Sequence, residues 1–171
     1  YSTSFANRLV ESVYSLCDSS TNVAFICCPT GFVASQHPYP KKNTRLLEFD
    51  QRFSALAPGQ FVPYDLNEPD IFPSSLKNSV DIAVVDPPYL NERTNKKLAQ
   101  TLRQILRPNG KLIIVTSKSV EPALHEIYCE APLGPLRETR LVVEHERLAN
   151  DFACWGSWDD AAHFGSSSFE E

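Results

Sequence analysis

The sequence predicts a doubly wound α/β domain with a mostly parallel, seven-stranded sheet that ends in an antiparallel hairpin. Short apolar runs alternate with stretches of helical periodicity along most of the chain, and two strand-like runs near its end follow one another closely. At 171 residues and 42% hydrophobic content, the chain can bury one core, which we expect to span residues 1–158. The Ser-, Gly- and Glu-rich residues 159–171 predict a disordered acidic tail. Because the chain starts with Tyr1 and not Met, we expect the domain to be truncated at its N-terminus.

The first part of the chain predicts a helix, a strand and a second helix. Apolar residues at helical spacing indicate an amphipathic helix over residues 3–17. Residues 23–28 form a continuous apolar run of the kind found in buried parallel strands. This run stops at a Pro-Thr-Gly sequence, and a short helix through about Gln36 and a turn over residues 37–40 should follow.

The middle of the chain predicts further strands and a long helix. We expect strands over residues 45–49, 60–64 and 81–85. Helical spacing of Leu and Ile then indicates a helix over residues 91–106, stopped by the Pro-Asn-Gly sequence at 108–110.

The last part of the chain predicts a strand over residues 111–116 and a helix over residues 121–128. Strands over residues 139–144 and 151–155 are separated by a short link, which favours an antiparallel hairpin at a sheet edge. Trp155 and Trp158 should pack on that edge.

Polar residues follow several of these strands, at the carboxyl ends where doubly wound sheets bind ligands. Glu48 and Asp50 share side-chain parity, so one can accept hydrogen bonds from the ribose of a nucleoside cofactor while the other orients it; a helix cap or a solvated carboxylate is the simpler alternative. Asp65 is placed to accept from an adenine amine. Gly31 alone does not make a multi-glycine nucleotide fingerprint.

The fourth strand runs directly into Asp86-Pro87-Pro88-Tyr89. Each proline fixes φ and removes a backbone donor, so this segment presents acceptors on a stiff backbone. Acceptors suit an amine, whose protons are donors, and the Tyr89 ring can stack on a base or face a cation. The alternative interpretation is a proline-stiffened strand end with a core tyrosine.

Composition limits the classes of partner and site. The formal net charge is −5 and no stretch clusters Lys and Arg, which favours a protein or small-molecule partner over nucleic acid. The five cysteines form no CxxC pair and the four histidines share no spacing, so we expect no metal. An odd cysteine count without a secretory signal fits a reducing compartment, and no apolar run approaches the ~20 residues that span a bilayer.

The order of these features resembles the seven-strand, Rossmann-like S-adenosylmethionine-dependent methyltransferases, and the Asp-Pro-Pro-Tyr box is similar to that of enzymes that methylate exocyclic amines. More closely, the chain resembles the eukaryotic elongation factor 1-alpha lysine methyltransferases, long labelled adenine-specific DNA methyltransferases. The similarity runs from Tyr1-Ser2 to about Trp155. It rests on residues 47–53 (LEFDQRF), 64–69 (YDLNEP), 81–90 (DIAVVDPPYL) and 148–152 (LANDF).

The resemblance implies S-adenosylmethionine as the cofactor and assigns two sets of site residues. The cofactor contacts would be Cys28, Pro29, Thr30, Glu48, Asp50 and Asp65, and the set that holds the amine would be Asp86, Pro87 and Tyr89. The family usually has aromatic residues before the Tyr-Ser pair with which this chain begins, and residues 130–140 depart from its pattern.

We therefore expect a cytoplasmic enzyme that methylates a lysine ε-amine of a protein, with elongation factor 1-alpha as the substrate that the resemblance implies. Two alternatives remain open. One is adenine-N6 methylation of DNA or RNA with Tyr89 stacked on a flipped base, against which the acidic balance argues. The other is a methyltransferase-like binding module without turnover, against which the intact box argues.

Overall fold

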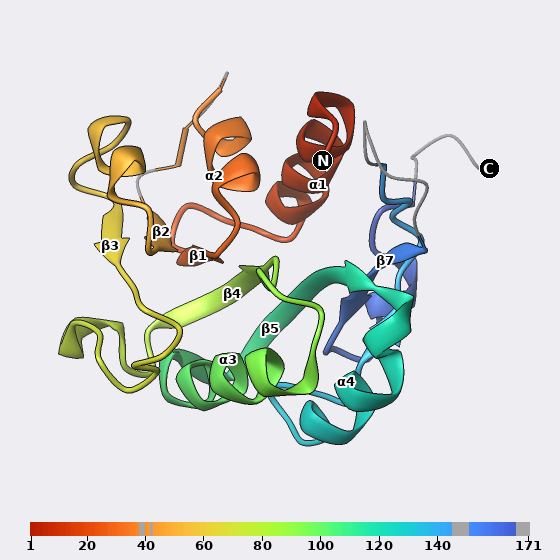
Figure 1. Cartoon of the computed structure of the whole chain (residues 1–171). Coiled ribbons are helices and arrows are strands. Elements are labelled where there is room, and N and C mark those ends of the chain that lie inside the picture. Colours follow the sequence, from red (N-terminus) through yellow and green to blue (C-terminus); the bar gives the residue numbers. More distant parts are fainter. Residues whose placement is uncertain (38–39, 42, 145–150, 167–171) are drawn as a thin grey trace.

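The fold is built on one mixed sheet (Figure 1). The computed structural model describes residues 1–37, 40–41, 43–144 and 151–166. Within them, a seven-stranded sheet has the order β3-β2-β1-β4-β5-β7-β6. The strands are β1 (Val23–Ile26), β2 (Thr44–Glu48), β3 (Phe61–Pro63), β4 (Val80–Val85), β5 (Leu106–Ser117), β6 (Arg137–Glu138) and β7 (Phe152–Gly156).

Helices cover both faces of the sheet. In Figure 1, α1 and α2 lie on one side of the strands, and α3 and α4 lie on the other. The bounds are α1 (Thr3–Ser15), α2 (Pro29–Ser35), α3 (Glu92–Ile105) and α4 (Glu121–Ile127). Along β1, Val23 and Phe25 join the core cluster that contains α1, whereas Ala24 and Ile26 join the cluster that contains α3 and α4. This alternation explains why β1 is apolar at every position.

Local sequence signals fix where the helices begin. The Ser2 hydroxyl accepts from Phe5 N at 3.0 Å and caps α1, and the Asn91 side chain accepts from Thr94 N at 2.8 Å and caps α3. Pro29 occupies the first turn of α2, where its missing N–H costs no hydrogen bond.

The predicted fold class is confirmed. Strands β3, β2, β1, β4 and β5 pair in parallel, and β7 pairs antiparallel with both β5 and β6. Elements before residue 91 begin and end within two residues of their predicted bounds. Pro38 and Tyr39, in the predicted turn, lie outside the described residues.

The C-terminal hairpin differs from its prediction. Its first strand, β6, has two residues, Arg137 and Glu138, and lies before the expected range of 139–144. After Thr139, which still donates to Cys154 O, the chain leaves the sheet and runs towards α1, where Glu144 O accepts from Ser2 N at 3.1 Å. Residues 139–144 are therefore not a strand.

The boundary between α3 and β5 also differs from the prediction. The helix ends at Ile105, and β5 begins at Leu106, so it includes the Pro-Asn-Gly sequence expected to form a stop. Leu106 pairs with Val80, and a register shift before Ile82 absorbs the irregular sequence. A Cβ at Gly110 would lie 2.9 Å from the Arg107 carbonyl oxygen, so the irregularity needs glycine there.

Trp155 and the residues after it pack more closely than predicted. Trp155 is fully buried, because β7 lies inside the sheet and not at its edge, and Trp158 is half-buried with its ring 5.6 Å from that of Phe164. Phe164 belongs to the core cluster, so the disorder expected from residue 159 onward does not hold for residues 159–166. Residues 167–171 lie outside the described residues.

Candidate active site

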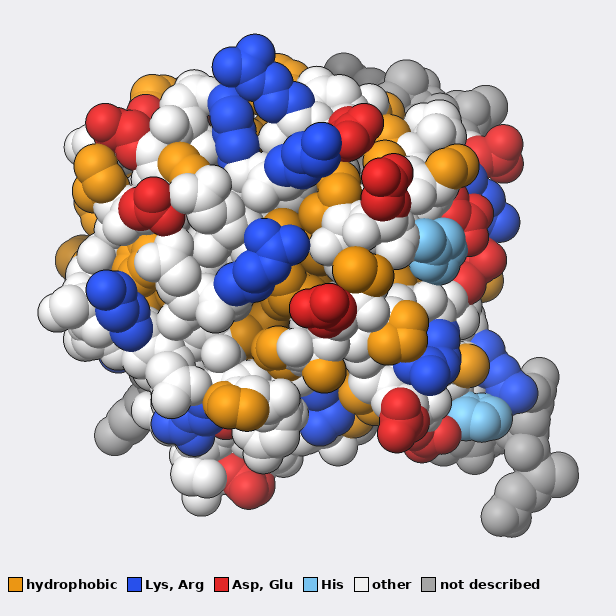
Figure 2. All heavy atoms as spheres, turned by 90° about the horizontal axis from the view of Figure 1, so that it is seen from below, with side chains coloured by type: hydrophobic (Ala, Val, Ile, Leu, Met, Phe, Trp, Pro, Cys, Tyr) orange, Lys and Arg blue, Asp and Glu red, His pale blue; other side chains and the backbone are white. Residues whose placement is uncertain are grey.

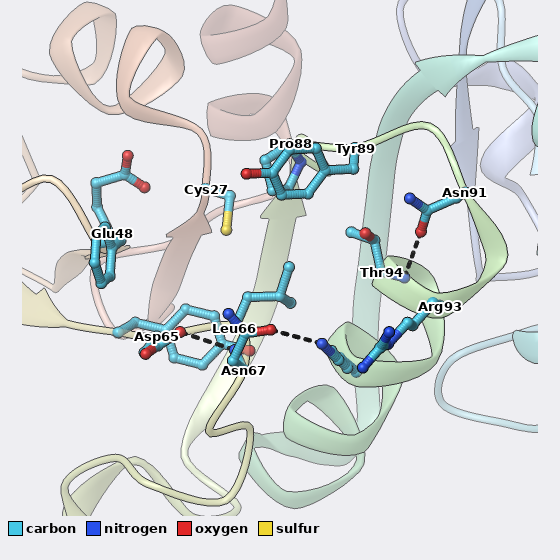
Figure 3. Close-up of a pocket in the computed structure, with 13 residues that line it drawn as sticks. Cys27, Glu48, Asp65, Leu66, Asn67, Pro88, Tyr89, Asn91, Arg93 and Thr94 are labelled. Atoms are coloured by element: carbon cyan, nitrogen blue, oxygen red, sulfur yellow. Dashed lines mark hydrogen bonds between the residues drawn. The ribbon is translucent and has the colours of Figure 1, made fainter.

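A cavity opens at the carboxyl ends of β1 to β4, where the sequence predicted a ligand site (Figure 3). Its volume is about 510 Å³, within the range of small-molecule sites. Strand ends, the two loops after β3 and β4, and α3 all contribute to its wall. The lining residues are Cys27, Glu48, Phe49, Tyr64, Asp65, Leu66, Asn67, Pro88, Tyr89, Asn91, Arg93, Thr94 and Lys97.

Of the two acidic residues at the end of β2, only Glu48 lines this cavity. Its carboxyl is half-buried, and this burial raises its pKa. Asp50 instead caps the 3₁₀ turn of residues 51–55, accepting from Arg52 N at 3.0 Å and forming an ion pair with the Arg52 guanidinium at 2.6 Å. Glu48 is therefore the acid available to a ligand, and Asp50 has the cap role that was the simpler alternative.

Asp65 lies across the cavity from Glu48. Its Oδ1 accepts from Asn67 N at 2.8 Å, which fixes the loop after β3 and leaves Oδ2 for a further donor. The Tyr64 hydroxyl shares a 2.6 Å hydrogen bond with Thr101 of α3. This bond ties the loop to the helix that forms the opposite wall of the cavity.

Cys27 lines the same cavity and has a φ of 53°, in the left-handed region that non-glycine residues rarely adopt. Its backbone N–H donates to Leu47 O at 2.9 Å, so the strained conformation is held by the sheet. Burial, with smaller contributions from Glu48 and Asp86, raises the pKa of its thiol to about 12. The thiol is therefore neutral at physiological pH and acts as a small apolar wall.

The predicted contacts at Cys28, Pro29 and Thr30 do not line this cavity. Cys28 is buried in the core, and Pro29 and Thr30 line a shallow groove between the starts of α1 and α2. Gly31 has a packing role, since a Cβ there would lie 3.0 Å from the Phe25 ring and the Cys28 sulfur. The structure thus brings together Glu48 and Asp65, but not the three residues after β1.

Asp86 ends β4 beside the cavity, and its carboxyl is largely enclosed. Its backbone N–H donates to Ile26 O at 3.3 Å, which holds the start of the box against β1. The Tyr1 hydroxyl donates to Asp86 Oδ1 at 2.9 Å. Burial raises the pKa of Asp86 to about 7, although the Tyr1 hydrogen bond acts in the opposite direction. A carboxyl of this kind is a candidate for interaction with a charged or amine-bearing substrate.

The rest of the box passes from core to surface. Pro87 is buried, whereas Pro88 and Tyr89 line the cavity, and the Tyr89 side chain is 64% exposed. The alternative of a core tyrosine is therefore wrong for Tyr89. An exposed ring next to a buried carboxyl suits contact with a substrate.

Sequence reasoning missed Tyr1 and the residues of α3. Arg93 and Lys97 line the cavity one turn apart, and Lys97 Nζ donates to Asn67 Oδ1 at 2.6 Å. Their spacing at the start of the helix after the box was the one available signal. Tyr1 carried none, because its partner Asp86 is 85 residues away in the sequence.

The remaining candidates do not join the site. Among the described residues, no three His, Cys, Asp or Glu side chains gather closely enough to hold a metal ion. His37, His125 and His163 are exposed, and His145 lies outside the described residues. In the part of the chain that the structure describes, no helix is long and apolar enough to cross a membrane.

Solved structures share this fold. A crystal structure of a predicted O-methyltransferase from Agrobacterium tumefaciens matches 88% of this chain and 78% of its own, with a TM-score of 0.59 and 14% identity. Aeropyrum pernix fibrillarin, solved with bound S-adenosyl-L-methionine, matches 81% of this chain and 66% of its own, with a TM-score of 0.58 and 13% identity. These likenesses show that the chain has the fold of methyltransferases.

The chain belongs to the family described as probable N6-adenine methyltransferase, whose model matches residues 1–160, and this match together with the fold makes it an S-adenosylmethionine-dependent methyltransferase. Curated relatives carry a different activity in their names. The Saccharomyces cerevisiae protein-lysine N-methyltransferase EFM5 is 29% identical over 93% of this chain and 69% of its own length. The Danio rerio EEF1A lysine methyltransferase 1 is 28% identical over 93% of this chain and 94% of its own length. These matches confirm the resemblance identified from the sequence.

The residues present fit S-adenosylmethionine, the cofactor of the class. Glu48 offers a half-buried carboxylate for ribose hydroxyls, and Asp65 has a free acceptor oxygen beside the apolar Leu66 for an adenine edge. Phe49, whose side chain is 73% exposed, adds an aromatic surface at the cavity wall.

Proposed function

We propose that this chain transfers a methyl group from S-adenosylmethionine to a lysine ε-amine of a protein. The observation that carries the proposal is that relatives matching 93% of the chain are named protein-lysine methyltransferases. The largely enclosed carboxyl of Asp86, three residues before the exposed Tyr89, supports it, because a lysine side chain needs an acceptor at its tip.

The cofactor supplies an electrophilic methyl group on a sulfonium. The protein supplies position: Glu48 and Asp65 would hold the nucleoside from two strand ends, and Pro88 and Tyr89 line the same cavity. Holding the two reactants in line replaces a bimolecular encounter, and this positioning provides much of the acceleration.

The amine end of the substrate would be held by Asp86 and the Pro87 carbonyl. Lysine has an unperturbed pKa of about 10.4, and only its neutral amine has a lone pair for the methyl group. Desolvation in a buried site lowers an amine pKa, and the acceptors then orient the remaining N–H groups. As the N–C bond forms and the S–CH₃ bond breaks, the sulfonium would leave as the neutral thioether S-adenosylhomocysteine, and Tyr89 would face the positive charge that passes to the nitrogen.

The names of the relatives support a particular protein as the substrate. The mouse, bovine and zebrafish relatives are named EEF1A lysine methyltransferase 1, which supports elongation factor 1-alpha as the substrate. We also propose the cytoplasm as the compartment. All five cysteines are free thiols, as is usual in a reducing environment.

Adenine-N6 methylation is the second candidate, because the family description names it. The exposed Tyr89 ring could stack on a flipped base. The charge distribution disfavours this reading: on the face that carries α3 and α4, Lys and Arg side chains are interspersed with acidic ones and form no continuous basic stripe (Figure 2). The formal net charge is −5.

The deciding experiment incubates the full-length protein with S-adenosylmethionine carrying a labelled methyl group, together with recombinant elongation factor 1-alpha or total nucleic acid. We expect label in the protein fraction, resistant to nuclease and sensitive to protease, and methyl-lysine by mass spectrometry. An Asp86→Asn variant provides the background. Methyl-adenine without methyl-lysine would replace the proposal with the second candidate.

A further inference from the structure

We propose that Tyr1 is a positioning residue for methyl transfer: its hydroxyl occupies Oδ1 of Asp86, so that Oδ2 is the oxygen left to hold the substrate amine. This inference rests on the proposed function and deepens it, because it adds a residue from the start of α1 to a site otherwise built from strand ends.

The contact between the two side chains is direct. The Tyr1 hydroxyl lies 2.9 Å from Asp86 Oδ1 and 3.4 Å from the Val115 carbonyl oxygen on β5. A phenol has one proton to donate, and the shorter distance assigns it to the carboxylate. Hydrogen bonds to a charged acceptor are about twice as strong as neutral ones, so this bond restricts rotation of the carboxylate.

The Tyr1 ring is held in place by aromatic neighbours. It lies 5.1 Å from the ring of Phe5, which is fully buried, and 6.3 Å from the ring of Phe152, at an interplanar angle of 81°. The next residue, Ser2, caps α1 with its side chain and donates its N–H to Glu144 O. The hydroxyl is therefore presented to Asp86 by packed elements and not by a free end of chain.

The groups around Asp86 determine how readily its carboxyl ionises, and the Tyr1 donor is one of them. Glu48 faces it from β2, and the thiols of Cys27 and Cys28 face it from the end of β1. The Cys154 thiol of β7 faces the Tyr1 hydroxyl. Burial and Glu48 disfavour the carboxylate, whereas the hydrogen bond from Tyr1 favours it.

Tyr1 itself stays a donor over the working range of pH. Burial and the neighbouring Asp86 both raise the pKa of its hydroxyl. Its proton is therefore available to Asp86 whenever the carboxyl is ionised. A hydroxyl with only a packing role would not change how Asp86 titrates, and this difference makes the proposal testable.

The test uses Tyr1→Phe in the full-length protein, which keeps the ring contacts and removes only the hydroxyl. Tyr14→Phe is the matched control, because the Tyr14 hydroxyl donates to Ser35 O at 2.7 Å from the last turn of α1, and neither residue lines the cavity. We measure kcat/KM for the protein substrate against pH, cofactor affinity by calorimetry, and the Asp86 carboxyl titration by carbon-13 NMR.

With the donor lost, the ionised form of Asp86 is disfavoured, and its carboxyl titration should move up by about one pH unit. The acid limb of kcat/KM should move with it, giving roughly tenfold lower activity on that limb, while cofactor affinity stays unchanged. In an Asp86→Asn background, Tyr1→Phe should cause no further loss, because it acts through the carboxylate. Tyr14→Phe should leave all three measurements as in the wild type.

An unshifted Asp86 titration in Tyr1→Phe would overturn the proposal, as would an equal loss of activity at every pH. The NMR titration needs no substrate. A wild type that methylates no protein would thus refute the proposed function and still leave the link between Tyr1 and Asp86 to be judged by its own measurement.

Discussion

Replacing Asp86 by Asn should stabilise the folded protein by an amount that grows with pH. Burial raises the folded-state pKa of Asp86 to about 7, whereas an unfolded Asp titrates at about 3.9. The carboxyl is thus a group whose folded pKa lies above its unfolded one. Its contribution to stability is fully present below about pH 4 and is lost as pH rises through 7. Asn cannot ionise, and its side-chain oxygen can still accept from Tyr1.

The magnitude follows from the two pKa values. Three pKa units correspond to about 4 kcal/mol in total, and linkage places about 2–3 kcal/mol of this between pH 5 and pH 8. Because the cavity beside Asp86 admits water, we expect the smaller figure of about 2 kcal/mol, equivalent to about 4–8 °C in Tm for a domain of this size.

The assay is urea unfolding of the wild type and Asp86→Asn at several values between pH 5 and pH 8, without cofactor. Asp50→Asn is the control, since Arg52 lowers the pKa of Asp50 and the group is ionised in both states over this range. The stability difference between Asp50→Asn and the wild type should therefore be flat with pH. A flat difference for Asp86→Asn, or a variant less stable than the wild type at pH 8, would refute the reasoning.

Three further predictions concern the cavity. Glu48→Gln should weaken S-adenosylmethionine binding in calorimetry by about 1–3 kcal/mol, whereas Asp50→Ala should change it by less than about threefold; equal effects would contradict the assignment of one acid to the ligand. Tyr89→Ala should lower kcat by about tenfold or more and Tyr89→Phe by much less, because the ring face contacts the cation; a larger loss in Tyr89→Phe would point to the hydroxyl instead. Cys27→Val should be less stable to urea than Cys27→Gly by about 1–2 kcal/mol, since a β-branched residue is strained at a φ of 53°; equal midpoints would mean that the backbone relaxes.

Sequence reasoning predicted the parts of the fold that local patterns determine. Strand β1, and β4 after Asp81, are continuous apolar runs, and such a run is recognisable from the sequence because both of its faces are buried. The Asp-Pro-Pro-Tyr box followed from its position after β4, and Glu48 and Asp65 followed from the rule that ligands bind at strand ends.

The missed features depend on distant partners. Arg137 and Glu138 have no strand signature and are a strand only because they pair with Gly156 and Trp155. Asp50 could not be separated from Glu48 by parity, because the difference lies in Arg52, which holds the Asp50 carboxylate outside the cavity.

Contacts between residues 1–8 and the later residues Glu144 and Phe152 affect when this part of the fold can form during protein synthesis. The Tyr1 ring packs on Phe152, and Ser2 and Arg8 bind Glu144, so residues at the two ends of the domain hold one another. A ribosome adds roughly 5–20 residues per second, so Glu144 and Phe152 are synthesised several seconds or more after Tyr1 and Ser2. Until Phe152 has left the ribosome, Asp86 lacks the packed Tyr1 donor. A nascent chain can thus complete its parallel strands before Asp86 gains the hydrogen bond from Tyr1, which forms in its packed setting only when almost the whole domain has been made.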